Sequence, residues 1–249
     1  MNDNTVVRLK NEAECYGCGA CIAICPKNAI RKKETVLGVW FPEIDYDLCI
    51  SCGKCIRVCE SKSVCEKVFD KKAYIAYNKN QLMRTQSASG GVFSALATYV
   101  LDCGGSVFGA ELTLKNGKVF VEHNIVVQIK DLTKLLGSKY VQSDTSKAYR
   151  KVKKELLSGR MVLFCGTSCQ IVGLKNYLQN VDMSNLYTID LICHGVPSIG
   201  LFNSYISYLQ KKSNGLVRSF SFRTKEKGKI KYEIDAQIDD KYIGGGQPQ

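Results

Sequence analysis

Residues 15–25 read CYGCGACIAIC, and residues 49–59 read CISCGKCIRVC. Both runs have the spacing C-x2-C-x2-C-x3-C, which is typical of bacterial sequences that hold two [4Fe–4S] clusters. Three cysteines of one run bind one cluster, and the fourth binds the other, because the chain crosses over between them. The expected ligand sets are Cys15, Cys18, Cys21 and Cys59 for one cluster and Cys49, Cys52, Cys55 and Cys25 for the other.

Two other uses of clustered cysteines fit this pattern less well. Structural zinc takes four ligands, usually from two pairs, whereas this chain has two matching quartets. Disulfides need an oxidising compartment, and residues 1–10 are mixed polar, without the apolar core of an export signal. Thirteen cysteines in 249 residues therefore favour a reducing cytoplasm and metal use.

The positive charge of the chain lies mainly after the cysteine runs. The formal net charge is +12; residues 1–62 carry 9 basic and 8 acidic side chains, and residues 63–249 carry 26 and 15. This basic part is expected to attract an anionic cofactor or an acidic partner. Its basic residues are not clustered with aromatics, so we expect no nucleic-acid partner. The apolar stretch at 90–101 is too short to span a bilayer, so no membrane span is expected.

The hydrophobic pattern divides the chain into two units and predicts an α+β fold overall. Residues 1–65 are expected to form a ferredoxin-like unit, with a hairpin at 29–42 whose Trp40 and Phe41 either shield the clusters or serve as ordinary core aromatics. Residues 66–249 are expected to form an α/β domain, because predicted helices alternate with buried strands. The predicted strands are 73–77, 107–114, 118–125, 161–164, 186–192, 217–222 and 230–238, and the predicted helices are 90–101, 146–157 and one that follows 197–198.

Two polar segments of the second unit have residues that suit anion binding. Ser87, Ser89, Gly90 and Gly91 precede the helix at 90–101, where free N–H groups favour a phosphate. The alternative is a helix that is simply capped, with Ser89 as its N-cap. Residues 137–143 place a cation, an aromatic side chain and several polar groups together, which suits either a flavin contact or a polar strand edge.

Two further segments follow predicted strands at the position where α/β sheets bind ligands. They are residues 165–170, with Cys165 and Cys169, and residues 193–198, with Cys193 and His194. They favour a redox or metal site, or else inert buried cysteines. His194 has a stronger claim to function than His123, and we expect it to be the first candidate for an acid–base group.

Together these segments resemble the coenzyme F420 hydrogenase/dehydrogenase beta-subunit family. The resemblance rests on residues 87–93, 137–143, 166–170 and 193–198, which follow the family's order, and it extends from the cysteine runs to about Arg223. It implies a noncovalent FAD in the α/β domain. The residues implied in binding it are Ser87, Ser89, Gly90, Gly91, Ser138, Lys139, Tyr140 and Gln142, with Lys139 expected to contact the flavin or its phosphates.

The chain departs from this family at two points. Ser168 stands where the family usually has proline, a change that should be tolerated. Family members also continue further, usually with a Cys-x-x-Cys pair that this sequence lacks, so the α/β domain is expected to be truncated at its C-terminus. The resemblance implies a third [4Fe–4S] cluster in a full-length form, with Cys169 and Cys193 among its ligands.

The resemblance therefore implies a cytoplasmic FAD and iron–sulfur oxidoreductase. It would pass electrons between a hydride carrier, coenzyme F420 or similar, and a redox partner protein, because flavin exchanges two electrons and each cluster one. The alternative is a ferredoxin-type electron-transfer module without a substrate of its own, for example in a polysaccharide-synthesis setting.

Overall fold

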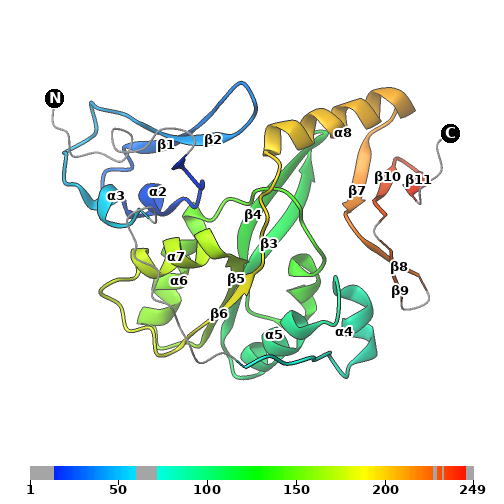
Figure 1. Cartoon of the computed structure of the whole chain (residues 1–249), viewed down its shortest axis with the longest axis horizontal. Helices are drawn as coiled ribbons and strands as arrows, with labels where there is room; N and C mark the ends of the chain where they lie inside the picture. Colours follow the sequence, from blue (N-terminus) through cyan, green and yellow to red (C-terminus); the bar gives the residue numbers. More distant parts are fainter. Residues whose placement is uncertain (1–13, 60–71, 227–228, 232, 245–249) are drawn as a thin grey trace.

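A computed structural model describes residues 14–59, 72–226, 229–231 and 233–244. It places a small N-terminal unit beside a larger α/β domain, as the sequence predicts (Figure 1). The expected domain boundary at residues 65 and 66 lies outside the described residues. None of the described helices is long and apolar enough to cross a membrane.

The N-terminal unit pairs a short helix after each cysteine loop with one hairpin. Helix α2 (Ala20–Ile24) and helix α3 (Lys54–Arg57) each begin after a glycine in the left-handed region, because a cysteine loop must turn sharply there. Strands β1 (Ile30–Glu34) and β2 (Trp40–Ile44) form the predicted antiparallel hairpin, with Ile30 opposite Ile44. These two isoleucines are buried against cysteines of both runs.

The α/β domain contains a four-stranded sheet in the order β4-β3-β5-β6. Strands β3 (Ser106–Lys115) and β4 (Lys118–Val126) form the hairpin that Asn116 and Gly117 predict, and both turn residues have positive φ. Strands β5 (Val162–Thr167) and β6 (Leu186–Leu191) continue the sheet in parallel. The carboxyl ends of β5 and β6 therefore lie at the same edge.

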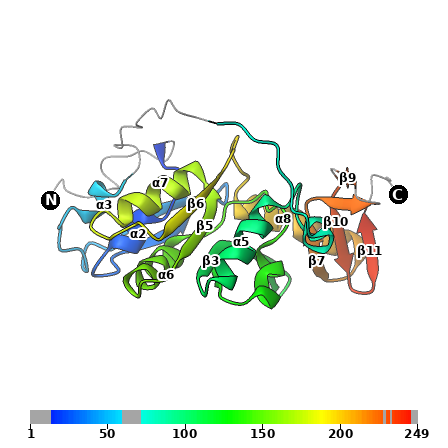
Figure 2. The same ribbon diagram turned by 90° about the horizontal axis from the view of Figure 1, so that it is seen from below.

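Helices cover both faces of this sheet (Figure 2). Helix α6 (Ser146–Leu157) and helix α7 (Ser168–Tyr177) pack on the face that carries Phe108 and Phe164. Helix α5 (Val92–Asp102) and the 3-10 helix η3 (Ile129–Leu135) pack on the opposite face, which carries Val107 and Leu163. The short helix α4 (Gln81–Gln86) precedes α5.

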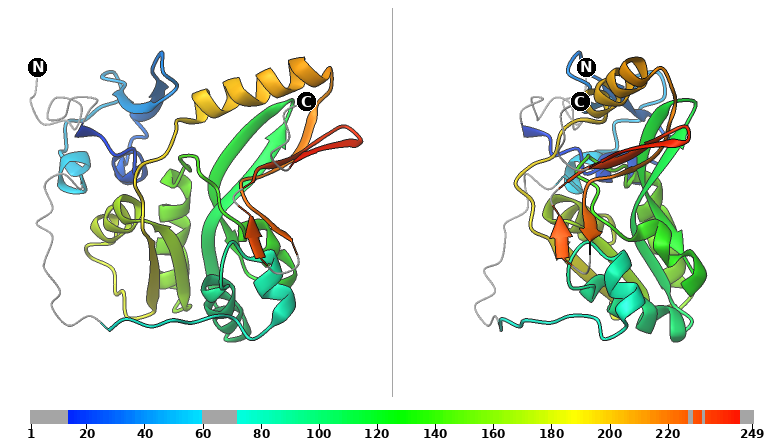
Figure 3. Two further views of the ribbon diagram at one scale, coloured as in Figure 1. Left: turned by 45° about the vertical axis from the view of Figure 1, so that its right-hand side comes forward. Right: turned by 90° about the vertical axis from the view of Figure 1, so that its right-hand side faces the viewer.

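The C-terminal part of the chain packs on the far end of the β3–β4 hairpin (Figure 3). Helix α8 (Ile199–Ser213) begins after Ser198, which caps it by accepting a hydrogen bond from the Leu201 N–H. A three-stranded sheet follows in the order β11-β10-β7. Its strands are β7 (Val217–Ser221), β10 (Asp235–Ile238) and β11 (Lys241–Gly244), and the separate hairpin β8 (Thr224–Glu226) and β9 (Lys229–Lys231) lies beside them.

Three sequence predictions about local structure were wrong. Residues 73–77 form no strand, and Tyr74 and Ile75 are exposed, because no described strand pairs with them. Gly91, not Ser89, is the N-cap of α5, because the left-handed backbone that begins the helix falls two residues after Ser89. The predicted strand 230–238 is divided between β9 and β10.

A buried polar network joins strands β4 and β5 to helix α7. His123 stacks on Phe164 with ring centroids 5.0 Å apart, and its Nε2 lies 2.9 Å from the Cys165 carbonyl oxygen. Its Nδ1 lies 3.0 Å from the Ser143 hydroxyl, which also accepts a hydrogen bond from Gln170. Both ring nitrogens are therefore satisfied inside the core, which gives His123 a structural role.

We expect His123→Gln to flatten the pH dependence of stability on the acid side. Burial lowers the pKa of His123 from 6.5 to about 4. The unfolded chain therefore binds more protons in this window, and the free energy of unfolding falls as the pH drops through it. Between pH 6.5 and about 5 this group should account for about 2 kcal/mol. Urea unfolding followed by circular dichroism at several pH values measures the slope, and equal slopes in both proteins would contradict the assignment.

Candidate functional site

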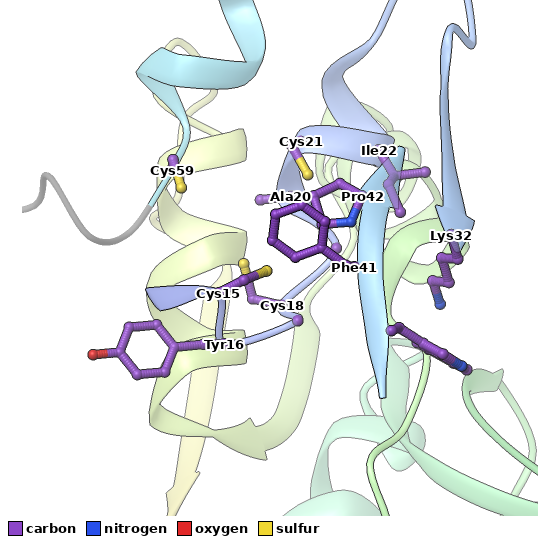
Figure 4. A pocket seen from close by; sticks show the side chains of 13 residues that line it. Cys15, Tyr16, Cys18, Ala20, Cys21, Ile22, Lys32, Phe41, Pro42 and Cys59 are labelled. Carbon is purple, nitrogen blue, oxygen red and sulfur yellow. The ribbon is translucent and has the colours of Figure 1, made fainter. Parts of the chain in front are cut away.

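The cysteines of the first expected ligand set line one cavity in the N-terminal unit. Cys15, Cys18, Cys21 and Cys59 surround it, although Cys59 comes from the second run (Figure 4). The hairpin supplies further lining: Trp40, Phe41, Pro42 and Lys32. Figure 4 shows Phe41 and Pro42 beside Cys21, so side chains of the hairpin lie next to the cysteines of this cavity.

The second expected set lines a separate cavity. Cys49, Cys52 and Cys55 surround it together with Cys25, which comes from the first run. The crossed arrangement therefore holds at both cavities. The sulfurs surround a space, as a cube of iron and sulfide requires. Among the described residues, no three Cys, His, Asp or Glu side chains converge closely enough to hold a single ion.

In the first cavity, thiolates are unfavourable unless a positively charged group lies between them. Burial raises the pKa of Cys21 well above its ordinary value, and the nearby thiols of Cys18, Cys15 and Cys59 raise it further. Thiolates in this position need a positive centre, which the iron of a cluster supplies. Backbone N–H groups already donate to two sulfurs of the second set, from Ala29 to Cys25 at 3.2 Å and from Ser51 to Cys49 at 3.4 Å. Such hydrogen bonds tune the potential of a bound cluster.

The first cysteine loop packs directly against the α/β domain. A Cβ atom on Gly173, in the middle of α7, would lie 3.0 Å from the Cys18 sulfur and 3.2 Å from the Tyr149 hydroxyl. A glycine is costly inside a helix, and here it allows a ligand sulfur to reach the helix backbone. The side chains of Ala20 and Ala23 in α2 are buried in the same hydrophobic core as the side chain of Tyr149.

Residues 142–145 of the α/β domain hold this loop in place. The Gln142 side-chain amide donates to the carbonyl of Tyr16 at 3.3 Å, and the Thr145 hydroxyl donates to the carbonyl of Cys18 at 2.6 Å. Lys32 forms an ion pair with Asp144, and its ammonium lies 3.4 Å from the centroid of the Trp40 ring. Sequence reasoning assigned Gln142 to the cofactor, but in this structure its side chain contacts the cysteine loop.

Lys139 lies near the end of strand β5, on the face of the sheet that α5 covers. Burial lowers the pKa of Lys139 to about 8, although Glu111 and Cys165 oppose that shift. Its ammonium donates to the Leu136 carbonyl at 2.6 Å. Gly109 lies on this face too: a Cβ there would touch Phe93 of α5 and Leu135 of η3 at ordinary distances. Lys139 thus lies near Glu111 and Cys165, and Phe93 of α5 packs near Gly109, two residues before Glu111 on the same strand.

The Ser-Gly-Gly segment is largely engaged in its own packing. The Ser87 hydroxyl donates to the Met83 carbonyl at 2.7 Å. A Cβ on Gly90 would lie 2.9 Å from the Ala76 oxygen, and Gly91 has a φ of 80°. The side chain of Ser89 is exposed, and its carbonyl accepts from Lys225 at 2.8 Å. The N-cap of α5 is Gly91, which has no side chain to bond the first backbone N–H groups of the helix.

The remaining predicted site residues differ in exposure. Cys193 and His194 are exposed just beyond strand β6, whereas Cys169 is partly buried, with its sulfur 3.3 Å from the Thr167 hydroxyl. Burial raises the pKa of Cys165 to about 12, so this residue remains a neutral thiol. Ser138 is half-buried, and Tyr140 packs edge-on against Phe222 with ring centroids 5.7 Å apart. Sequence reasoning missed Glu111 and Thr145, because isolated polar residues give no motif.

Two family models match this chain. Residues 14–63 match the model described as 4Fe-4S dicluster domain. Residues 159–244 match the model for the C terminus of the beta subunit of coenzyme F420 hydrogenase/dehydrogenase. The second match confirms the resemblance drawn from the motifs over residues 159–244, and the first supports the iron–sulfur assignment of the two cavities.

A search of curated proteins found no match. Among solved structures, one similar chain belongs to the xenon-derivatised F420-reducing [NiFe] hydrogenase complex from Methanosarcina barkeri, with 18% sequence identity and a TM-score of 0.46. The match covers 69% of this chain and 60% of that chain, so the present sequence spans less than two thirds of that relative.

We expect about eight iron atoms per chain after anaerobic purification, because each cavity has four cysteine ligands. Cys59→Ser and Cys25→Ser should each remove one cluster, but a different one, and leave about four iron atoms. Iron analysis with electron paramagnetic resonance measures this. Cys103→Ser, which changes an exposed cysteine outside both cavities, is the control. A wild-type value near four would contradict the ligand sets.

Gly173→Ala should disturb the first cluster without unfolding the chain. The added methyl group would press on the Cys18 sulfur. Overpacking costs about 1–3 kcal/mol, against a gain of about 1 kcal/mol in helix propensity, so a net loss near 1 kcal/mol is expected. The paramagnetic spectrum of the cluster held by Cys18 should change, while Lys175→Ala on the exposed side of the same helix should leave it intact. An unchanged spectrum in Gly173→Ala would show that the contact is not tight.

Proposed function

We propose that this chain, which joins a 4Fe-4S dicluster domain to a beta-subunit domain of the coenzyme F420 hydrogenase/dehydrogenase family, is an FAD-dependent iron–sulfur oxidoreductase. Residues 1–65 would form the cluster unit and residues 66–249 the flavin domain. Electrons would move between a hydride carrier, coenzyme F420 or similar, and a redox partner protein in a reducing cytoplasm. The proposal rests mainly on the hydrogen bonds that join the first cysteine loop to residues 142–145. These residues follow Lys139 by only a few positions in the chain.

The α5 start and Lys139 are the groups that fit the anionic part of FAD. The α5 N-terminus offers backbone N–H groups and the positive end of a helix dipole, without a side-chain cap. Ser87, Gly90 and Gly91 shape this turn by their own packing, so the backbone rather than their side chains would meet the phosphates.

Lys139 supplies the only charged side chain among the proposed flavin-binding residues. Burial lowers its pKa to about 8, which means that its ammonium is poorly solvated where it lies. An anion or a carbonyl oxygen placed beside it would stabilise the charged form and be stabilised in return. Ser138 and Tyr140 flank it and offer hydroxyl groups to the same ligand.

When bound, FAD would exchange a hydride as two electrons, and each [4Fe–4S] cluster would exchange one. The protein's part is to hold these groups near each other and away from water. Gln142 and Thr145 fix the first cysteine loop, Trp40 and Phe41 line its cavity, and the ion pair between Lys32 and Asp144 ties the hairpin to the α/β domain.

Three strand-end residues receive roles under this proposal. His194 is exposed beyond β6, within the chain segment that the family resemblance marks, and we propose it as the acid–base group that serves the hydride carrier. Cys169 and Cys193 would contribute to a third cluster together with further ligands. Lys139, not His194, remains the residue on which flavin binding depends.

A second candidate function is an electron-transfer module without flavin. Two of the proposed flavin-binding side chains already form hydrogen bonds within the protein, which favours this function. The Ser87 hydroxyl and the Lys139 ammonium both donate to backbone carbonyls. In that case the α/β domain would serve as a scaffold for the cluster unit, for example in polysaccharide synthesis.

Flavin content distinguishes the two functions. We expect about one FAD per chain, identified by chromatography after heat release from anaerobically purified protein. Lys139→Met should weaken FAD binding about tenfold, as expected for loss of a charge-assisted contact. Lys130→Met, an exposed lysine on η3, is the matched control and should bind FAD normally. Wild-type protein that fails to bind added FAD while retaining its iron would favour the electron-transfer module.

A further inference from the structure

We propose that the rim of the second cysteine cavity is the docking surface for an acidic one-electron carrier protein. This inference rests on the proposed function, in which the N-terminal unit exchanges electrons with a partner. The rim consists of the exposed residues Pro26, Lys27, Ile50, Cys52 and Lys54, all of which line that cavity.

The two cavities differ in what surrounds them. The first cysteine loop is held by the α/β domain, through Gly173 behind Cys18 and through the Gln142 and Thr145 hydrogen bonds. Among the described residues, both cavities are lined by the N-terminal unit alone, but the contacts with the α/β domain lie behind the first one. The carbonyl of Val58, next to Cys59 of the first set, also accepts a hydrogen bond from Asn176 of α7 at 3.4 Å. The first cavity is therefore the inner one, and the second is the one that a partner can reach.

The exposure of one cysteine ligand also indicates that the second cavity is the outer one. Cys52 is exposed, whereas the other seven cysteines of the two sets are partly buried. An exposed ligand sulfur brings the cluster that it holds close to the surface, which suits electron exchange with another protein. Ile50, next to Cys49, exposes 57% of its surface, and an apolar side chain at that point gains burial only when a partner covers it.

The charges of the rim indicate the kind of partner. Lys27 and Lys54 are its charged residues, and no carboxylate is among the described residues that line this cavity. An apolar centre between cations is complementary to a carrier whose own cluster lies within a ring of carboxylates. Electron-transfer encounters bury little surface, so such a partner needs only a small contact around the exposed sulfur.

An acidic bacterial two-cluster ferredoxin is the probe, and calorimetric titration at low and high salt gives the binding constant. With both of its clusters loaded, the wild-type chain should bind the probe, and added salt should weaken the binding. Lys27→Glu with Lys54→Glu should raise Kd about tenfold or more. Lys211→Glu with Lys212→Glu, an equal charge change on exposed lysines of α8, should leave Kd within about twofold.

Carbodiimide cross-linking followed by mass spectrometry locates the contact independently. Cross-links from Lys27 and Lys54 to probe carboxylates support the proposal, and cross-links mainly to α8 lysines overturn it. Equal weakening by both charge changes also overturns it. Iron analysis must give about eight atoms in both variants, and a Lys27→Glu, Lys54→Glu variant that keeps both its iron and its affinity refutes the assignment. Sedimentation that shows a dimer of the chain alone, abolished by the rim change, would identify a second copy as the occupant instead.

Flavin binding gives an independent readout. If the proposed function fails, the chain lacks FAD but the rim still binds the ferredoxin. If this inference fails, FAD is present while the rim variants bind the probe as the wild type does. The two failures are therefore distinguishable in one set of samples.

Discussion

The contact between the first cysteine loop and helix α7 constrains the rest of the structure. Cys18 reaches the helix backbone only because residue 173 has no side chain, and the small residues Ala20 and Ala23 let α2 lie against Tyr149. Small side chains on both sides of this interface bring a ligand loop and a sheet domain together. Without that approach, the chain would be a ferredoxin tethered to a separate domain.

The same contact gives residues 142–145 a structural role that their sequence does not indicate. Ser143 belongs to the buried network of His123 and Gln170, while its neighbours Gln142 and Thr145 hold the cysteine loop. One short segment thus joins the core of the sheet to the cluster unit. Because Lys139 lies just before it, the proposed flavin site and the inner cavity share a common support.

The inner and outer cavities follow from one repeated motif placed in two environments. Both cysteine runs have the same spacing, but the helix of the first run, α2, buries Ala20 and Ala23 in the α/β core, whereas α3 of the second run buries no residue and joins that core only through Val58 at its C-terminal end. The second leaves Cys52 and Ile50 at the surface. Under the proposed function, the direction of electron flow would therefore arise from packing, not from any difference in ligand chemistry.

The sequence by itself determined which cysteines line each cavity, the hairpins at 30–44 and 106–126, and the helix at 146–157, because cysteine spacing, the Asn116–Gly117 turn and helical periodicity are local signals. Only the tertiary structure decided that His123 is a core residue, that Gln142 contacts the cysteine loop and that residues 73–77 pair with no described strand. The first two outcomes depend on partners 40 or more positions away in the chain, Cys165 for His123 and Tyr16 for Gln142. No pattern within a short window of residues carries that information.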